Sequence, residues 1–389
     1  MELTNNGRLA QQLLEQAVEL GASDMHIEPV AEQVRIRLRI DGLLQELCRL
    51  PLSAYSTLLT QCKVQSGMDI AEKRVPQDGR WQLTYKNRVI DLRLSTLPTI
   101  KGEKLAIRLL DQKQGLWHLA DLGMSAENFT LYQKMYTHAN GLVLLTGPTG
   151  SGKTTTLYAT LQFLQKEGLN LVTIEDPVEY KLDGVNQVAV NRKAGLDFAV
   201  GLRALVRQDP DIIMVGEIRD KETASMAVQA ALTGHLVLST LHTNSAVGAI
   251  ARLLDMGVEP YLLAAALRGV LAQRLVRRIC PQCAEKYEST ATEQKYLNLP
   301  AGKNYQLTRG KGCPFCRGSG YHGRLAVQEL LPIDEYMGEL ISANAGKAAL
   351  LSHGAGLGWH SLYADGVSKV LAAKTTAAEL WRVGITKEE

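Results

Sequence analysis

A glycine-rich segment near the middle of the chain has the composition and spacing of a loop that binds nucleotide phosphates. The segment matches the pattern G-x-x-x-x-G-K-[ST] in full and consists of Gly147, Pro148, Thr149, Gly150, Ser151, Gly152, Lys153 and Thr154. Backbone N–H groups of such a loop bind phosphate oxygens, the lysine reaches the β- and γ-phosphates, and the last hydroxyl ligates Mg²⁺. The segment therefore predicts a site for ATP and Mg²⁺.

The residues on either side of this loop provide the structural context that the motif requires. An apolar run at 142–145 precedes the loop and predicts a buried parallel strand. Leu157, Leu161 and Leu164 follow at helical spacing until Gly168. A strand, a loop and a helix in this order disfavour the alternative, a glycine-rich turn that binds no ligand.

A second segment, at 173–180, brings three carboxylates to the end of a predicted strand. These are Glu175, Asp176 and Glu179. Ligands of open α/β sheets bind at the carboxyl ends of the strands, so these acids are candidates to face the nucleotide, its metal ion and the attacking water. The alternative is an acidic turn exposed to solvent.

A third segment, at 211–217, is an apolar strand that ends in Gly216 and Glu217. Gly216 stands where a strand of this type usually carries an aspartate on the metal side. Glu217 is therefore the best candidate to position or deprotonate water for in-line attack on the γ-phosphate.

Two histidines, His235 and His242, flank a further apolar strand. An isolated histidine in such a strand is usually a satisfied core residue. Beside a nucleotide site, a histidine can instead donate to the γ-phosphate and report its presence to a neighbouring subunit. We expect this sensor role for His242 and, with less support, for His235.

Four of the six cysteines form two Cys-x-x-Cys pairs: Cys280, Cys283, Cys313 and Cys316. The pairs are separated by 29 residues and have the arrangement that tetrahedral thiolate coordination of zinc requires. Disulfides conflict with a cytosolic ATP-binding protein, whereas vestigial or redox-active pairs compete with the zinc interpretation. Cys48 and Cys62 have no ligand-like spacing and are expected to be core thiols.

The composition indicates a cytoplasmic protein without strong affinity for nucleic acid. The 389 residues include 43 basic and 40 acidic side chains, so the formal charge is only +3, and 5% of residues are aromatic. No apolar run is long enough to span a bilayer. The most apolar helical candidate, at 261–276, is interrupted by Arg268 and Arg274.

Residues 1–111 are expected to form a small α+β domain. The predicted elements are a helix at 8–20, a short edge strand or turn at 23–29, a hairpin at 34–47, a helix at 53–66, a turn at 77–79, a second hairpin at 81–94 and a strand at 105–110. Residues 112–125 are expected to connect this domain to the next.

From residue 126 onward the pattern is that of an α/β domain. Apolar runs at 142–146, 170–174, 211–215 and 235–240 alternate with helical segments, which predicts a parallel sheet with helices on both faces. The cysteine segment interrupts this domain at about 278–322. The part from about 330 to 389 is predicted to be helical, with a capping box at Thr376 and Glu379.

Together these motifs resemble those of the secretion ATPases. The resemblance rests on the phosphate loop, Glu-Asp-Pro-Val-Glu at 175–179, Arg-Gln-Asp-Pro-Asp at 207–211 leading into Gly-Glu, Thr-Gly-His at 233–235 and Leu-His-Thr-Asn at 241–244. The segments 23–29 and 76–80 also match signatures of this family. The tetracysteine insertion resembles that of the branch containing type II secretion and type IV pilus extension motors.

The resemblance implies a PAS-like N-terminal domain and a RecA-like ATPase domain in a homohexamer, with ATP held between the domains. It also implies that Arg80 and Arg93 stabilise charge on the phosphates, although by sequence alone both are equally consistent with plain surface residues. Domain closure on ATP would then drive assembly of pilin or pseudopilin filaments.

The resemblance also implies the partners. These are an inner-membrane platform protein and a membrane-anchored partner, which together would hold the ATPase at the inner membrane. Relatives usually carry an extra N-terminal domain for docking, whereas this chain begins almost directly at the segment 23–29. The sequence leaves two functions open besides that of a filament motor: a ring ATPase that translocates nucleic acid, and a scaffold that binds ATP without hydrolysing it.

Overall fold

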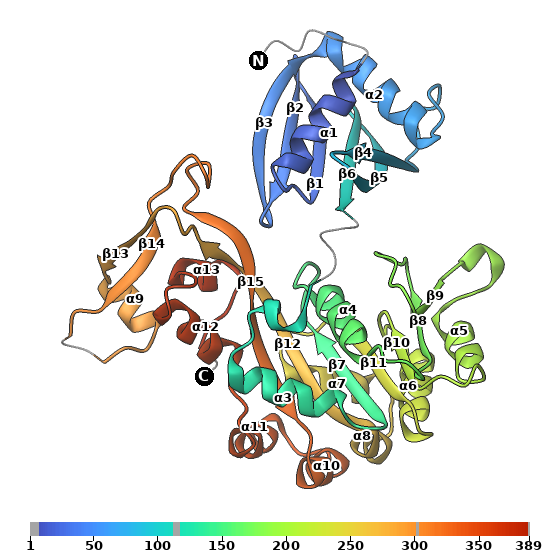
Figure 1. The fold of residues 1–389 in the computed structure, drawn as a ribbon, viewed down its shortest axis with the longest axis vertical. Helices are drawn as coiled ribbons and strands as arrows, with labels where there is room; N and C mark the ends of the chain where they lie inside the picture. Colours follow the sequence, from blue (N-terminus) through green and yellow to red (C-terminus); the bar gives the residue numbers. More distant parts are fainter. Residues whose placement is uncertain (1–7, 112–116, 301–302, 388–389) are drawn as a thin grey trace. The chain divides into compact units, whose positions relative to one another are not determined.

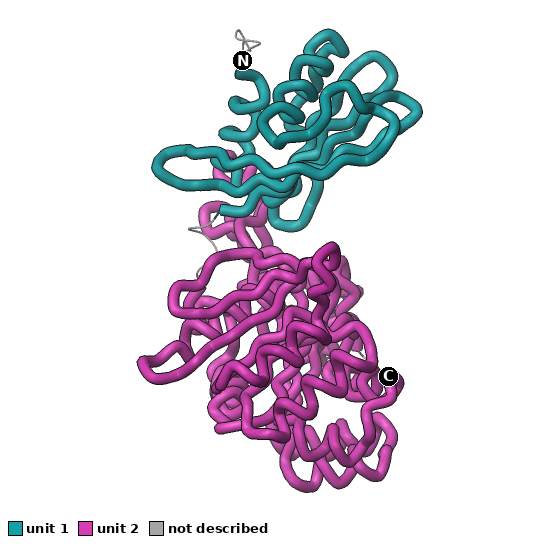
Figure 2. Tube along the Cα trace, turned by 90° about the vertical axis from the view of Figure 1, so that its right-hand side faces the viewer, with its two compact units in different colours: residues 1–116 teal, residues 117–389 magenta. Residues whose placement is uncertain are grey.

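The computed structural model describes residues 8–111, 117–300 and 303–387, and the chain divides into two compact units, Met1–Leu116 and Trp117–Glu389 (Figure 2). The division falls within the segment 112–125 that was predicted to be a connection. Residues 112–116 of that segment lie outside the described part, and Leu119–Leu122 forms a short 3-10 helix, η2.

The first unit is a six-stranded antiparallel sheet with two helices (Figure 1). Its strand order is β3-β2-β1-β6-β5-β4. The elements are α1 (Leu9–Glu19), β1 (Asp24–Val30), β2 (Gln33–Ile40), β3 (Leu43–Pro51), α2 (Leu52–Ser66), β4 (Gln77–Tyr85), β5 (Arg88–Thr99) and β6 (Gly102–Asp111). Alternate apolar residues of the strands pack with both helices in one core, which leaves Arg35, Arg37 and Arg93 on the other face.

Two local predictions for this unit are wrong. The segment 23–29 was expected at an edge or in a turn, but β1 pairs with both β2 and β6 and so lies inside the sheet. The segment 77–79 was expected to be a turn, but it begins β4. A Cβ atom on Gly79 would lie 2.6 Å from the backbone oxygen of Ser66, so this glycine permits close packing against the end of α2.

The second unit contains a seven-stranded sheet in the order β15-β12-β7-β11-β10-β8-β9. The strands are β7 (Gly141–Thr146), β8 (Leu171–Glu175), β9 (Asn186–Ala189), β10 (Ile212–Val215), β11 (Leu236–Leu241), β12 (Leu267–Ile279) and β15 (Tyr321–Pro332). All neighbours are parallel except β12 and β15. The predicted α/β class is confirmed.

Helices cover both faces of this sheet (Figure 1). One face packs against α3 (Ala126–Tyr136) and α4 (Lys153–Leu164). The other face packs against α5 (Phe198–Leu205), α6 (Lys221–Leu232), α7 (Ala246–Asp255), α8 (Pro260–Ala266), α10 (Glu335–Ser342) and α11 (Lys347–Gly356). Because both faces are covered, the central strands β7 and β11 are mostly apolar and are buried along their whole length.

The segment 261–276, predicted to be helical, contains a short helix followed by a long strand. Only α8 is helical, and β12 begins at Leu267. This strand lies between β7 and β15 and is buried along most of its length, so its apolar residues do not alternate. A short apolar run of this kind cannot be distinguished from a buried helix by periodicity.

The cysteine segment forms the far end of the β12–β15 hairpin. It contains β13 (Ala284–Glu288), α9 (Ala291–Tyr296) and β14 (Gln306–Gly310). Two further helices, α12 (Leu362–Leu371) and α13 (Ala377–Arg382), complete the helical C-terminal part. Thr376 caps α13 as predicted, whereas the Glu379 carboxylate accepts hydrogen bonds from Arg277 and Arg382 in place of the expected capping box.

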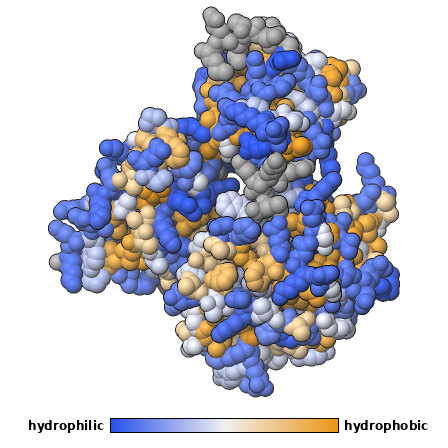
Figure 3. All heavy atoms as spheres, viewed as in Figure 1, coloured by the Kyte–Doolittle hydropathy of each residue, from blue (hydrophilic) through white to orange (hydrophobic). Residues whose placement is uncertain are grey.

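No helix in the described ranges is long and apolar enough to cross a bilayer. The face of the molecule shown in Figure 3 mixes hydrophilic and hydrophobic residues over both units.

Candidate active site

The phosphate loop joins β7 to α4 at the carboxyl edge of the seven-stranded sheet. Every residue of β7 is buried, and Lys153 begins α4, so the loop lies at the N-terminus of a helix. Gly147 has a φ of 148°, and a Cβ atom there would lie 2.4 Å from the backbone oxygen of Gln273. The glycine therefore allows the loop to pass directly against β12.

Lys153 is buried and its ammonium lies against the loop. Its Nζ donates to the carbonyl oxygens of Gly147 at 2.7 Å and Pro148 at 3.2 Å. Burial lowers the pKa of Lys153 to about 8, while the nearby Glu217 carboxylate opposes this shift. Thr154 follows in the first turn of α4 and is exposed, so its hydroxyl is accessible to a bound Mg²⁺.

Glu217 and His242 converge on the lysine from two neighbouring strands. Glu217 follows β10 and His242 follows β11; β11 pairs with β7, and β10 is the next strand beyond β11 in the sheet. The Glu217 carboxylate accepts from Arg219 at 2.6 Å and lies 3.4 Å from Nε2 of His242. Burial, followed by the charge of Lys153, lowers the pKa of His242 below its ordinary value of 6.5, so the ring is neutral at pH 7.

A threonine pair connects the phosphate loop to the histidine segment. Thr146, the last residue of β7, has its hydroxyl 2.7 Å from the hydroxyl of Thr243. The backbone N–H of Thr243 also donates to the Thr146 hydroxyl at 2.9 Å. Since these residues flank Gly147 and His242, the hydrogen bonds join the phosphate loop directly to the histidine segment.

The acidic segment after β8 is anchored to α4 through Tyr158. The Glu175 carboxylate is buried, accepts from the hydroxyls of Tyr158 and Thr173 and from Gln187, and has its pKa raised by burial. The backbone N–H of Glu179 donates to the Tyr158 hydroxyl at 3.2 Å.

Asp176, between these two acids, is exposed and pairs with Arg192 at 3.1 Å. The acids therefore lie in different environments. Glu175 is buried and holds Tyr158 by a hydrogen bond, whereas Asp176 is open to solvent. Their roles toward the nucleotide stay predictions.

The four predicted zinc ligands come together in one cluster. The Sγ atoms of Cys280, Cys283, Cys313 and Cys316 all lie within 4.8 Å of one another. Three of the Sγ–Sγ distances are 3.7–3.8 Å, which is too long for a disulfide. A zinc ion with Zn–S bonds of about 2.3 Å separates its ligands by about 3.8 Å in a tetrahedron, so the donor set fits zinc.

Backbone groups around the cluster favour a thiolate at Cys316. The N–H groups of Cys313 and Gly320 point at Sγ of Cys316 at 3.2 and 3.3 Å. Burial alone would raise the pKa of Cys316, but these donors hold it below its ordinary value.

Comparison with known proteins identifies the family. A model described as type II/IV secretion system protein matches residues 4–382. The chain belongs to this family. It is 47% identical over 381 residues to the type II secretion system ATPase E of Vibrio cholerae, covering 98% of this chain and 75% of that relative. It is also 47% identical over 382 residues to the type II secretion system protein E of Pseudomonas aeruginosa, covering 98% of this chain and 76% of that relative.

Solved structures of similar proteins agree with the fold. The pilus retraction motor PilT with bound ADP has a TM-score of 0.65 and 25% identity, with 97% of each chain covered. The ATPase DotB of Legionella pneumophila has a TM-score of 0.71 and 19% identity, covering 98% of this chain and 97% of DotB, which shows the fold alone. The prediction of a secretion ATPase from the branch containing type II secretion and type IV pilus extension motors is confirmed by the family match and the relatives.

In this secretion ATPase, one predicted residue of the second unit, His235, lies away from the phosphate loop. His235 precedes β11, whereas His242 follows it, and six strand residues separate the two ends by about 20 Å. Arg80 and Arg93 lie opposite each other on β4 and β5 of the first unit. Their approach to the phosphates stays a prediction.

Three residues that the sequence analysis did not single out contact the site of this secretion ATPase. Arg219 lies two positions after Glu217. A charged residue so close to a catalytic candidate could have been recognised from the sequence. Tyr158 and Gln273 carried no such signal, because one lies in a helix of mixed composition and the other in a segment predicted to be helical.

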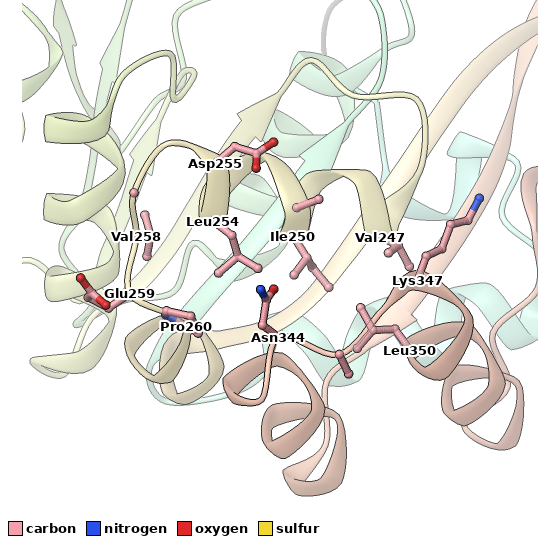
Figure 4. Close-up of a pocket in the computed structure, with 13 residues that line it drawn as sticks. Val247, Ile250, Leu254, Asp255, Val258, Glu259, Pro260, Asn344, Lys347 and Leu350 are labelled. Atoms are coloured by element: carbon pink, nitrogen blue, oxygen red, sulfur yellow. The ribbon is translucent and has the colours of Figure 1, made fainter.

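A cavity of about 450 Å³ lies apart from the phosphate loop, between α7, the start of α8 and the α10–α11 connection (Figure 4). Its wall is apolar at Ile250, Leu254 and Leu350, and Asp255 and Lys347 add charge. The residues lining it include none from the phosphate loop, so we do not assign the nucleotide to it.

Proposed function

We propose that this secretion ATPase hydrolyses ATP at the phosphate loop, with Glu217 as the base that positions and deprotonates the attacking water. The convergence of Lys153, Glu217 and His242 at one sheet edge is the observation that carries this proposal. As the water oxygen bonds to the γ-phosphorus, Glu217 takes its proton and ADP leaves. Arg219 orients the Glu217 carboxylate, and neutral His242 donates to the γ-phosphate.

The remaining predicted residues complete the nucleotide site. The exposed Thr154 hydroxyl would hold Mg²⁺, with Asp176 and Glu179 as candidates to orient its water ligands. When bound, Mg²⁺ neutralises charge on the β- and γ-phosphates. Glu175 acts by keeping Tyr158 and the acidic segment in place.

The test replaces Glu217 by Gln and measures nucleotide binding and turnover separately. Glu217→Gln should bind ATP with near wild-type affinity and lose turnover by about 10²–10⁴-fold, since only the proton acceptor is removed. Glu222→Gln, an exposed glutamate paired with Arg203 on a nearby helix, is the matched control. Equal turnover in Glu217→Gln and wild type would remove Glu217 from the mechanism.

We further propose that the active form is a homohexamer in which Arg80 and Arg93 of the first unit approach the phosphates. An arginine delivered by domain closure stabilises the charge that spreads over the γ-phosphoryl group. Turnover should rise as the ring assembles, measured with light scattering, and fall in Arg80→Ala but not in Arg49→Ala, an exposed arginine of the same unit. Turnover independent of concentration and of Arg80 would contradict a shared site.

The proposed task is assembly of a pseudopilin or pilin filament. The names of the relatives and the family support a place in type II secretion. The chain would act at the cytoplasmic face of the inner membrane through a platform protein and a membrane-anchored partner, without binding nucleic acid itself. Stimulation of turnover by the cytoplasmic part of a platform protein would support this, whereas stimulation by DNA with a steep salt dependence would favour a nucleic-acid motor.

The cysteine cluster is proposed to hold one structural zinc ion. Support comes from the Sγ–Sγ spacing and from four thiol donors with no open position for a substrate. Elemental analysis of protein prepared under reducing, chelator-free conditions should find one zinc per chain. Its absence there would refute the assignment.

A further inference from the structure

A single buried amide joins the phosphate loop to the strand behind it. Gln273 lies on β12, one residue past the Ala272–Thr146 pair that ends the contact with β7, and is 2% exposed. Its Nε2 donates to the carbonyl oxygen of Ser151 in the loop at 2.7 Å. Its Oε1 accepts from Thr156 of α4 at 3.1 Å and from Gln328 of β15 at 3.0 Å.

The contacts with Ser151 and Gln328 determine which way the amide faces. If the Gln273 amide were rotated by half a turn, its oxygen would lie against the Ser151 carbonyl oxygen. The NH₂ group of Gln273 would then lie against the NH₂ group of Gln328. Both contacts would be repulsive, because each pairs two acceptors or two donors. The loop therefore receives a donor of fixed position from outside its own motif.

The loop is shaped to admit this amide. Gly152 has a φ of 89°, and a Cβ atom built there would lie 2.8 Å from Nε2 of Gln273. A larger residue at 152 would therefore displace either the amide or the loop. The second motif glycine thus provides space for Gln273 as well as for the phosphate.

Gln328 in turn is held by the C-terminal helical part. It is fully buried, and its backbone N–H donates to Oδ2 of Asp365 on α12 at 2.7 Å. Asp365 pairs with Lys369 one turn later, and Lys369 donates to the carbonyl oxygen of Ala326 at 2.7 Å. A continuous set of buried contacts therefore runs from α12 through Gln328 and Gln273 to Ser151.

We propose that Gln273 is a positioning residue that keeps the phosphate loop in its nucleotide-binding conformation, with Gln328 orienting its amide. This rests on the proposed function, in which the phosphate loop binds ATP. Without the amide, the Ser151 carbonyl loses its buried donor and the loop populates other conformations. The intrinsic affinity is then multiplied by the fraction of loops that are still competent to bind, so the apparent affinity falls as that fraction falls.

The experiment uses the full chain with Gln273→Met, which keeps the side-chain length but removes the amide. The dissociation constant for a fluorescent ADP analogue should rise about tenfold. Because bound nucleotide reorders the loop, KM for ATP should rise while kcat stays within about twofold. Thr375→Val is the matched control, since this fully buried hydroxyl donates to the Arg277 carbonyl on the same strand, away from the loop.

A merely structural role would lower the unfolding temperature of both variants and change affinity in neither. Equal ADP affinity in Gln273→Met, Thr375→Val and wild type would overturn the inference while leaving the proposed function intact. Wild-type protein that binds no ADP would overturn both.

Gln328→Met provides a second test that leaves Gln273 in place. The Gln273 amide then lacks one of the groups that orient it, so the dissociation constant should rise by about threefold, less than in Gln273→Met. An unchanged dissociation constant in Gln328→Met would overturn the role of Gln328.

Discussion

The phosphate loop and the cysteine cluster both lie along β12, but they depend on the rest of the fold to different degrees. The loop contributes eight contiguous residues, and Glu217, His242 and Gln273 reach it from three other strands. The cluster takes all four ligands from two short segments at the end of one hairpin. The loop is therefore a site completed by tertiary structure, whereas the cluster is largely self-contained.

The largest effect on binding that we expect is loss of nucleotide binding in Lys153→Ala. Removing a buried charge that faces the phosphates should weaken ATP binding by about a hundredfold. Zinc content should stay at the wild-type level, because nothing in the cluster contacts Lys153. Isothermal titration with ATP and elemental analysis of the same sample check both parts, and parallel loss of zinc would show that the two sites are not independent.

The reciprocal change is Cys280→Ser. It should release the metal and unfold the end of the hairpin around β13 and β14, since a structural zinc site supplies the folding energy of its surroundings. ATP affinity should stay within about twofold, because distant sites behave independently. Hydrogen exchange locates the unfolding, and Cys48→Ser, outside the cluster, is the control.

A buried ion cluster between the two sites should have an intermediate effect. Glu379 of α13 is 1% exposed and accepts from Arg382 and Arg277, the latter on β12. Glu379→Gln leaves both arginines without their anion and should cost about 3 kcal/mol of stability. The exposed pair of Glu222 and Arg203 provides the control, and Glu222→Gln should change stability by less than about 0.5 kcal/mol.

Because of this buried ion cluster, the stability of the folded chain depends on pH in the acid range. Burial opposes ionisation of Glu379, but the two arginines lower its pKa from 4.5 to about 2. Since the folded pKa is depressed, this stabilisation is complete above pH 4.5 and is lost as the pH falls toward 2. Thermal unfolding from pH 6 to pH 3 should show a smaller decline in Glu379→Gln than in wild type; parallel curves would contradict this assignment.

The smallest effect near neutral pH is a pH dependence of nucleotide binding. The pKa of Lys153 is lowered to about 8, and only the ammonium form neutralises phosphate charge. ATP affinity should therefore be constant below pH 7 and fall by about tenfold per unit well above pH 8. Lys153→Arg keeps its charge throughout and should flatten the curve. A wild-type curve that is equally flat would show that the ammonium does not titrate in this range.

Sequence patterns predicted the parts of this molecule that are determined by residues close together along the chain. The alternation of apolar strands and helices, the eight-residue loop and the two Cys-x-x-Cys pairs each show their chemistry within a few residues. Predictions were wrong where burial on both sides removes periodicity, as in β12, which was expected to continue the helix α8. The prediction of a turn at 77–79 was also wrong, because Gly79 permits close packing against Ser66 within a strand.

The sequence by itself determined that the chain has a phosphate loop, an acid after each of two strands and four thiols in pairs, because each feature depends on neighbours along the chain. Only the tertiary structure decided which of these residues meet. The strand order brings Glu217 and His242 to Lys153 and places His235 at the opposite sheet edge. It also aligns Gln273 with Ser151, which are 122 residues apart. Such contacts depend on the register between strands, and no local pattern encodes that register.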